Sequence, residues 1–363
     1  MKREIKVLVL ALAVTFTACS KSNSGTDSGG ITTPTTPTNP VTPTATLQSS
    51  MPFPFGAAVN ISLLKNNTAY RALVIKEYNS LTAESVMKTA ALHPAQNTYD
   101  FTDADYLCDF AKTNGKRVHG HTLIWYKSLP AWITNFQGDA AAWENLLKTH
   151  IQTIVAHFKG KVVSWDVVNE AFEDDGTLRN SIWLQKLGPD YIARCYTYAH
   201  EADPDALLFY NDYGHEYGPT KRAAILSMVN GLVSRGIPIN GIGMQMHTRY
   251  NLGDSNWATA INACAATGLK VHISELDIAM NPNNDQTLTY TAALSEAQTQ
   301  KYKLIVQDYN AIPKAQQFGI TTWNVSDADS WIPGNYNRPD WPLPFDFNYA
   351  RKPCYQGILD GVK

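Results

Sequence analysis

The sequence has almost no net charge. Its 363 residues contain 30 Lys and Arg against 32 Asp and Glu, which gives a formal net charge of −2 at pH 7. Because binding to a phosphate backbone calls for a basic excess, we expect no nucleic acid partner. With 44% apolar and 17% charged residues, the composition is otherwise that of a globular protein, long enough for one large or two medium domains.

Cysteine is scarce and shows no clustering. After Cys19 come only Cys108, Cys195, Cys264 and Cys354, with no Cys-x-x-Cys spacing, so we expect no zinc site. Each of the four falls in a segment with a helical pattern, and we expect buried free thiols, with disulfides as the alternative. No His, Cys and Asp cluster has the spacing of a catalytic metal site, so the sequence predicts neither a metal nor another cofactor.

Long apolar runs are absent except at the N-terminus, where Ile5–Ala18 follows a basic start and is too short to cross a bilayer. Thr17-Ala18-Cys19 resembles a bacterial lipoprotein processing site. We therefore expect residues 1–19 to be a signal peptide and Cys19 to carry a lipid. The protein would be exported as a cell-envelope lipoprotein, at the outer membrane or cell surface, touching the membrane only through that anchor. Plain secretion is the alternative.

Residues 20–47 are low in complexity. Ser and Gly give way to the repeated Thr-Pro units of ITTPTTPTNPVTPT. Such a segment buries too little apolar surface to fold, and its prolines favour an extended spacer. We expect a disordered linker here, followed by a single domain over residues 48–363.

Within that domain, apolar runs typical of strands alternate with helical patterns. The predicted strands are Phe55–Val59, Ile75–Asn79, Arg117–Leu123, Val162–Val168, Leu207–Tyr210, Ile242–Met246, Val271–Leu276 and Ile320–Trp323. Between them lie helical segments such as Asp103–Thr113, Ala140–Phe158, Tyr191–Ala202, Thr220–Ser234 and Leu294–Tyr309. This alternation predicts a parallel sheet with crossover helices. Eight such units favour a (β/α)8 TIM barrel over an open doubly wound sheet.

Two strand ends carry carboxylates. In a (β/α)8 barrel, catalytic groups stand at the C-terminal ends of the strands. The run Val162–Val168 ends in Asn169-Glu170, and the run from Val271 continues into Ser274-Glu275-Leu276-Asp277. Either motif alone could be an ordinary strand that ends in a solvated or salt-bridged acidic loop. Together they place two carboxylates across the barrel mouth, as cleavage of a glycosidic bond requires: one protonated, to donate to the leaving oxygen, and one ionised, to attack the anomeric carbon.

Several separated motifs resemble those of the glycoside hydrolase family 10 xylanases. They are GHTLIW (120–125), LPAW (129–132), WDVVNEAFEDDG (165–176), GMQMH (243–247), SELD (274–277) and TTWNVSDADSW (321–331). The resemblance runs from about Phe55 to the end and implies an endo-1,4-β-xylanase that retains anomeric configuration on a (β/α)8 catalytic domain. Its partners would be xylan and xylo-oligosaccharides, and we expect a monomer. Nine Trp and 18 Tyr permit a carbohydrate partner, because flat rings stack on sugars.

The resemblance also implies roles for individual residues. Glu170 matches the general acid/base and Glu275 the nucleophile, with carboxyl groups expected ~5–5.5 Å apart. Asn169 matches the amide that binds the sugar 2-hydroxyl at the cleavage point, and His247 and Asp277 match the pair that supports the nucleophile. Positions that match the substrate-binding residues are Glu84, Lys88, His121, Trp125, Tyr213, Gln245, Trp323 and Trp331.

Three positions depart from the family pattern. Ser85 and Gly214 stand where Asn is frequent, and Tyr126 stands where His is frequent; these departures concern subsite affinity and leave the carboxylate pair intact. Two alternative functions remain. One is a related barrel glycosidase acting on cellulose or mixed-linkage glucan. The other is a surface glycan-binding lipoprotein on an inactive barrel, against which the presence of both carboxylates with His247 and Asp277 argues.

Overall fold

The computed structural model describes residues 45–363. The strands in this part of the chain are Phe55–Val59 (β1), Ser80–Ala83 (β2), Arg117–Ile124 (β3), Ser164–Asn169 (β4), Leu207–Asp212 (β5), Gly241–Met244 (β6), His247–Arg249 (β7), Lys270–Ala279 (β8) and Gln317–Thr322 (β9). The signal peptide, the lipidation site at Cys19 and most of the predicted linker lie outside the described residues.

The strands form a closed parallel barrel. In the sheet of the described residues the order is β6-β5-β4-β3-β2-β1-β9-β8-β7, and a pairing between β6 and β8 closes the ring. The short β7 adds to the outer part of β8, with His247 opposite Asp277, so the barrel itself consists of the other eight strands. All pairings are parallel, including the closing one between Gly241 and Lys270. The predicted (β/α)8 barrel is confirmed.

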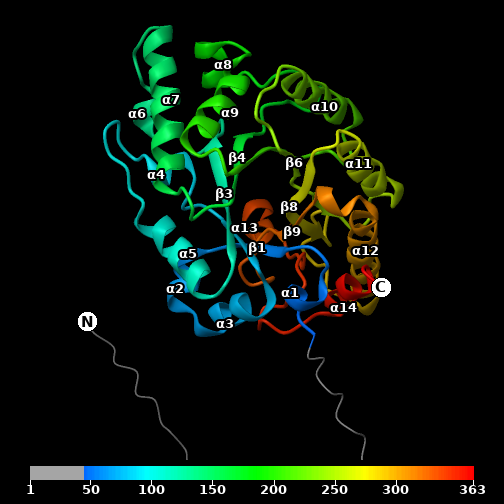
Figure 1. Ribbon diagram of the computed structural model, residues 1–363. Coiled ribbons are helices and arrows are strands. Elements are labelled where there is room, and N and C mark those ends of the chain that lie inside the picture. The colour runs from blue at the N-terminus through cyan, green and yellow to red at the C-terminus, as the bar shows by residue number, and fades with distance from the viewer. Residues whose placement is uncertain (1–44) are drawn as a thin grey trace, which may run out of the picture. The chain divides into compact units, whose positions relative to one another are not determined.

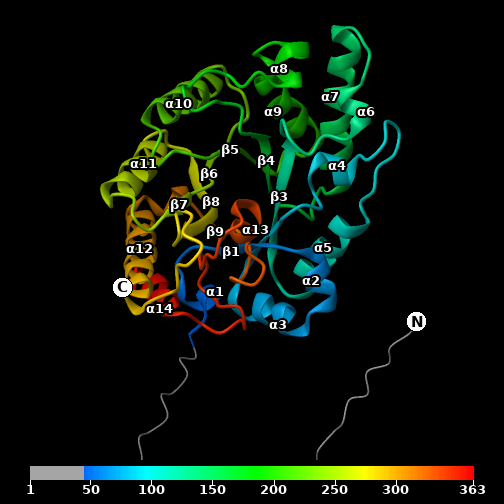
Figure 2. The same ribbon diagram turned by 180° about the vertical axis from the view of Figure 1, so that it is seen from behind.

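The long helices surround the strands on the outside, whereas the short α13 (Trp331–Tyr336) lies in the middle of both views, near β1 and β9 (Figures 1 and 2). Over residues 45–363 they are Leu47–Ser50 (α1), Ile61–Asn66 (α2), Thr68–Glu77 (α3), Thr89–Leu92 (α4), Thr102–Thr113 (α5), Ala131–Thr134 (α6), Ala140–His157 (α7), Ile182–Leu187 (α8), Tyr191–Ala202 (α9), Pro219–Ser234 (α10), Ser255–Ala265 (α11), Ala292–Ala311 (α12), Trp331–Tyr336 (α13) and Pro353–Asp360 (α14), with a 3-10 turn at Lys314–Gln316. Among these helices none is both long enough and apolar enough to cross a membrane.

The helices bury their apolar faces against the barrel. β4 is buried along its whole length, as a strand with helices on one side and the barrel interior on the other must be. The prediction of buried cysteine thiols is confirmed: Cys108, Cys195, Cys264 and Cys354 are free and buried, one each in α5, α9, α11 and α14.

The prediction of a second strand at Ile75–Asn79 is wrong. Residues 75–77 belong to α3 (Thr68–Glu77), and β2 begins at Ser80. This segment, Ile-Lys-Glu-Tyr-Asn, mixes apolar and polar residues over too short a length to show a clear period, so it fits the end of an amphipathic helix as well as a strand. Here Val74 packs into the core while Ile75 is 38% exposed, which is the alternation of a helix surface.

The first described residues are held in place at the base of the barrel. Leu47, which falls within the predicted linker, is fully buried, and its N–H donates to Glu77 Oε2 at 3.0 Å. The same carboxyl accepts from the Tyr355 hydroxyl at 2.8 Å and from Arg351 at 2.7 Å. α1, α3 and α14 are therefore joined at one buried carboxylate, at the opposite end of the strands from the catalytic candidates.

Candidate active site

The C-terminal ends of the barrel strands surround a cleft of about 660 Å³. Every predicted site residue except Asp277 lines it: Glu84, Lys88, His121, Trp125, Asn169, Glu170, Tyr213, Gln245, His247, Glu275, Trp323 and Trp331. Asp277 lies directly behind His247. Side chains that are scattered over more than half of the sequence thus meet in one cavity, because parallel strands deliver their C-terminal ends to the same edge.

Glu275 lies within β8 and is 4% exposed. Its Oε1 accepts from Asn211 Nδ2 at 2.8 Å, and its Oε2 lies 3.2 Å from His247 Nε2. Burial disfavours the charged form, but the hydrogen bond from His247, followed by the His121 imidazole and the Asn211 donor, outweighs burial and lowers the pKa of the Glu275 carboxyl. An ionised carboxylate held in a fixed direction is what a nucleophile requires.

His247 lies between two carboxylates. Its Nδ1 is 2.8 Å from Asp277 Oδ2, and that oxygen also accepts from the Trp331 indole N–H at 2.7 Å. Burial alone would lower the pKa of His247; the charge and hydrogen bond of Asp277, and then those of Glu275, raise it well above its ordinary value. A protonated imidazole donates from both ring nitrogens, so His247 stabilises the ionised form of Glu275.

The His247→Asn variant should therefore change the pH profile. A nucleophile at Glu275, as the sequence predicts, has to be a carboxylate, so activity should be lost as the pH falls through its pKa. Without the imidazole, burial still raises the pKa of Glu275, but the main contact that lowers this pKa is gone. The pKa of Glu275 should therefore rise, and the acidic limb of kcat/KM should move to higher pH. Kinetics on an aryl glycoside from pH 3 to 8 measure this shift. His200→Asn, an exposed histidine on α9, is the matched control; equal acidic limbs in both variants would contradict the assignment.

Glu170 follows β4 directly, where the chain turns sharply. Its φ of 56° lies in the left-handed region that few non-glycine residues adopt. Its N–H donates to the Asn211 carbonyl at 2.9 Å, and its own carbonyl accepts from Arg179 Nε at 2.9 Å. The side chain is 8% exposed, and Gln245 Nε2 donates to Oε1 at 2.9 Å. A neutral amide thus contacts Glu170, whereas an imidazole contacts Glu275, and such unequal surroundings are what separate an acid from a nucleophile.

Amide side chains connect the two carboxylates. Asn211 Nδ2, which binds Glu275, lies 2.8 Å from the terminal amide of Asn169. The Asn169 amide is best satisfied when its oxygen accepts from Trp125 Nε1 at 3.3 Å and its nitrogen donates to the Asn211 carbonyl at 3.2 Å. These contacts fix Asn169 at the point where the two carboxylates face the cleft.

Aromatic rings form the opposite part of the cleft. Lys88 Nζ lies 5.1 Å from the ring centroid of Trp125 and 5.5 Å from that of Trp323, and burial lowers the pKa of Lys88. The His121 ring meets the Trp323 ring edge-on at 5.3 Å. Glu84 stands at the same side, where its Oε2 accepts from an Asn60 amide at 3.1 Å. Flat rings with polar groups at their margins are suited to sugar rings.

Arg179 is an important residue that the sequence analysis did not single out. Besides binding the Glu170 carbonyl, its NH2 group donates to the Phe172 carbonyl and to the Tyr213 hydroxyl, both at 3.0 Å. Its guanidinium lies 4.2 Å from the ring centroid of Tyr126. Tyr126 therefore helps to support the loop that carries Glu170. No sequence pattern marks Arg179, because its partners come from the ends of three different strands.

Other residues of the site were also missed or only partly anticipated. Asn211 is a polar residue at the end of β5, a signal that could have identified it. Further residues that line the cleft are Asn60, Lys127, Tyr217, Asn335 and Tyr336. Of the departures from the family pattern, Ser85 lines the cleft, and Gly214 has a φ of +83°, a conformation that Asn also tolerates.

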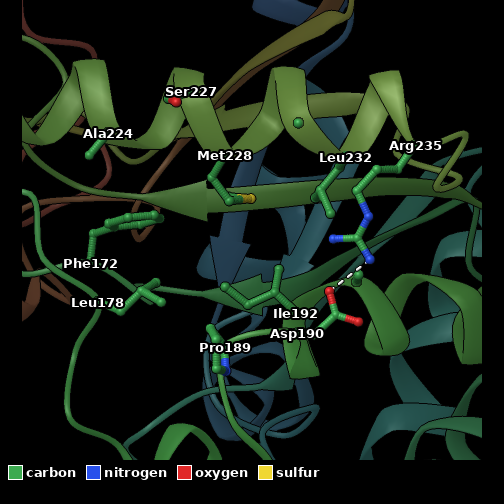
Figure 3. A pocket seen from close by; sticks show the side chains of 12 residues that line it. Phe172, Leu178, Pro189, Asp190, Ile192, Ala224, Ser227, Met228, Leu232 and Arg235 are labelled. Atoms are coloured by element: carbon green, nitrogen blue, oxygen red, sulfur yellow. Dashed lines mark ion pairs between the residues drawn. The ribbon is translucent and has the colours of Figure 1, made fainter.

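A second hollow of about 570 Å³ lies between α9 and α10. Figure 3 shows apolar side chains, among them Phe172, Ile192 and Met228, facing one another across it. Asp190 and Arg235 form an ion pair of 2.7 Å at one side. With its only carboxylate paired to an arginine, this hollow lacks the two carboxylates that hydrolysis needs. In residues 45–363, no three His, Cys, Asp or Glu side chains are grouped so that they could hold a metal ion.

A model of glycosyl hydrolase family 10 matches residues 45–361 of the chain. Among curated proteins, Exoglucanase XynX of Acetivibrio thermocellus is 38% identical over 86% of this chain and 29% of its own length. Endo-1,4-beta-xylanase B of Thermotoga neapolitana is 37% identical over 84% of this chain and 87% of its own length. The chain therefore spans less than a third of the first relative and most of the second.

Solved structures agree with the sequence relatives. The crystal structure of xylanase 10B from Thermotoga petrophila RKU-1 in complex with xylobiose is 35% identical to this chain, with a TM-score of 0.81. The match covers 87% of this chain and 95% of that one. At this identity and coverage, both the barrel and the order of its loops are alike.

Proposed function

The chain belongs to glycosyl hydrolase family 10, and on that basis we propose that it is an endo-acting 1,4-β-xylanase with a retaining mechanism. The observation that carries the proposal is the carboxylate pair: His247 favours the ionised form of Glu275, whereas Glu170 accepts from the neutral amide of Gln245 at the same cleft. The similarity to proteins named as xylanases, and to a xylanase bound to xylobiose, supports xylan and xylo-oligosaccharides as substrates.

In the first step, a carboxylate oxygen of Glu275 attacks the anomeric carbon of the bound xylose. Glu170 transfers its proton to the glycosidic oxygen as that bond breaks, so the reducing-side fragment leaves as an alcohol. The product is a covalent glycosyl ester of Glu275 and an ionised Glu170. Asn169, next to Glu170, binds the 2-hydroxyl of the reacting sugar, a contact that strengthens in the transition state.

In the second step, the ionised Glu170 takes a proton from water while the water oxygen attacks the anomeric carbon. The ester bond to Glu275 breaks, Glu275 returns to the carboxylate form, and Glu170 is again protonated. Two inversions leave the configuration unchanged. The rings of Trp125, Trp323 and Trp331 lie beside the sugars, with Glu84, Lys88 and His121 as hydrogen-bonding groups on the non-reducing side.

Product anomers test this proposal. Proton NMR during the first minutes of xylo-oligosaccharide hydrolysis should show the β-anomer of the new reducing end before mutarotation produces the α-anomer. Reducing ends should appear rapidly in long linear xylan, with a large early fall in viscosity, because cleavage is internal. Initial formation of the α-anomer would refute the double displacement, and binding without any release of reducing ends would revive the inactive-barrel alternative.

A β-1,4-glucan is the second candidate substrate, because one similar protein is named an exoglucanase. Xylose lacks the hydroxymethyl arm of glucose, and crowding by Trp323, Trp331 and Lys88 should reject that arm. The ratio of kcat/KM on aryl xylobioside and aryl cellobioside separates the two; a ratio in favour of cellobioside would select glucan.

Export as a lipoprotein is also proposed, on the basis of the sequence at residues 1–19. In a bacterial host, the wild-type protein should incorporate labelled palmitate and partition into the detergent phase of Triton X-114. The Cys19→Ala variant should remain unlabelled and aqueous. An unlabelled wild-type protein would indicate plain secretion instead.

A further inference from the structure

A smaller pocket opens beside the catalytic cleft, on the far side of His247. Its volume is about 230 Å³, roughly eight waters at about 30 Å³ each, which is the scale of one monosaccharide. We name it the side pocket. It is lined by Tyr217, His247, Thr248, Arg249, Asp277, Ala279, Pro282, Trp331, Ile332, Tyr336 and Arg338.

The side pocket adjoins the cleft. Tyr217, His247, Trp331 and Tyr336 line both cavities. His247 contacts Glu275 with one ring nitrogen and Asp277, in the side pocket, with the other. A group attached to a sugar near the cleavage point would therefore lie next to the side pocket while the main chain stays in the cleft.

Two arginines, Arg249 and Arg338, line the side pocket and bring positive charge to it. Arg249 ends β7, is exposed, and within residues 45–363 its guanidinium makes no ion pair. Arg338 follows α13; its Nε and NH2 groups both lie 3.2 Å from Asp340 Oδ2, and its guanidinium lies 4.7 Å from the ring centroid of Tyr336. Because a guanidinium has five N–H donors, Asp340 fixes the orientation of Arg338 and leaves other donors available.

The carboxylates around the side pocket already have partners. Asp277 accepts from His247 and Trp331 through Oδ2, while its buried Oδ1 has no hydrogen-bond partner among the described residues. Asp340 accepts from the N–H groups of Met280 at 2.7 Å and Trp341 at 2.9 Å, in addition to its contact with Arg338. Arg249 thus presents a guanidinium without an ion pair in residues 45–363 at the rim of a sugar-sized cavity that has tyrosine and tryptophan walls.

From this arrangement we propose that the side pocket binds an acidic sugar branch of the substrate, with Arg249 and Arg338 contacting its carboxylate. A planar guanidinium matches a carboxylate in two-point geometry, and the Tyr336 and Trp331 rings offer faces for the sugar. The branch would be a uronic acid attached to a backbone xylose next to the scissile bond. This inference rests on the proposed xylanase function and specifies the decoration that the enzyme prefers.

Arg249→Gln tests the side pocket, because the substitution removes the charge and keeps a polar side chain of similar length. We expect the ratio of kcat/KM on a glucuronate-branched xylo-oligosaccharide to kcat/KM on the linear oligosaccharide to fall roughly tenfold, the effect of one charge-assisted contact. The wild-type ratio should also decline as NaCl rises from 50 to 500 mM, since the rim charge is screened. Arg249→Lys should retain part of the ratio.

The matched control is Arg235→Gln, an arginine with a 52% exposed side chain that pairs with Asp190 at the separate hollow of Figure 3. It should leave the ratio at the wild-type value. An arabinose-branched oligosaccharide, which is neutral, should show no response to Arg249→Gln. The inference would be overturned if Arg249→Gln and the wild type had the same ratio of kcat/KM on the glucuronate-branched and linear oligosaccharides. It would also be overturned if Arg249→Gln lowered kcat/KM on the arabinose-branched oligosaccharide as much as on the glucuronate-branched one. Failure to cleave the linear oligosaccharide at all would instead refute the proposed function.

Discussion

The Glu275→Ala variant is expected to lose roughly five orders of magnitude or more in kcat on xylan, about 7 kcal/mol of barrier at 1.36 kcal/mol per factor of ten. The covalent route disappears with the carboxylate, and the rest of the cleft offers no second nucleophile in a comparable position, since Asp277 is 1% exposed and lies behind His247. Single-turnover and steady-state assays on an aryl xylobioside measure the loss for both steps.

Azide supplies a decisive control for this variant. A small anion that enters the space of the lost carboxylate attacks the anomeric carbon once, while Glu170 still protonates the leaving oxygen, so the expected product is an α-glycosyl azide. The His247–Asp277 pair remains in place, so binding of xylo-oligosaccharide by calorimetry should persist and show that the variant is folded. Residual activity within tenfold of the wild type would remove Glu275 from the nucleophile role.

The Glu170→Ala variant should have an effect that depends on the leaving group. On xylan, where the departing oxygen needs a proton, kcat/KM should fall about 10²–10⁴-fold, the usual range for loss of a general acid. On an aryl glycoside with an acidic phenol, bond cleavage needs no proton, so the first step should stay fast and the glycosyl ester of Glu275 should accumulate. A rapid burst of phenol followed by slow turnover measures this.

Added azide should restore turnover of that aryl glycoside and produce a β-glycosyl azide, because the ester is displaced with a second inversion and azide needs no base. Asp174→Ala is the matched control, because Asp174 is an acid in the same loop and its side chain is 77% exposed. Like the wild type, the Asp174→Ala variant should show no burst of phenol. A Glu170→Ala variant whose loss is equal on xylan and on the activated aryl glycoside would contradict the acid/base role.

The fold could be predicted because most of the barrel strands coincide with apolar runs between helical patterns. Phe55–Val59 and Tyr191–Ala202 were predicted with the bounds that the structure has for β1 and α9. The prediction failed at Ile75–Asn79, a mixed apolar and polar segment whose first three residues end α3, and the true strand β2, Ser80–Ala83, contains two hydroxyl residues. Local sequence carries no period over so few residues, so only packing against β1 and β3 decides that segment.

The sequence by itself determined the barrel and the residues that gather at its mouth. Glu170 and Glu275 end or interrupt apolar strands, and the barrel rule places such ends together. Only the tertiary structure decided how the two carboxylates differ: His247 contacts one and Gln245 the other. It also decided that Arg179 supports the loop that carries Glu170 and that Arg249 and Arg338 line one pocket beside the cleft. These contacts join loops that follow different strands, and the pattern along any one segment holds no information about which loops come into contact.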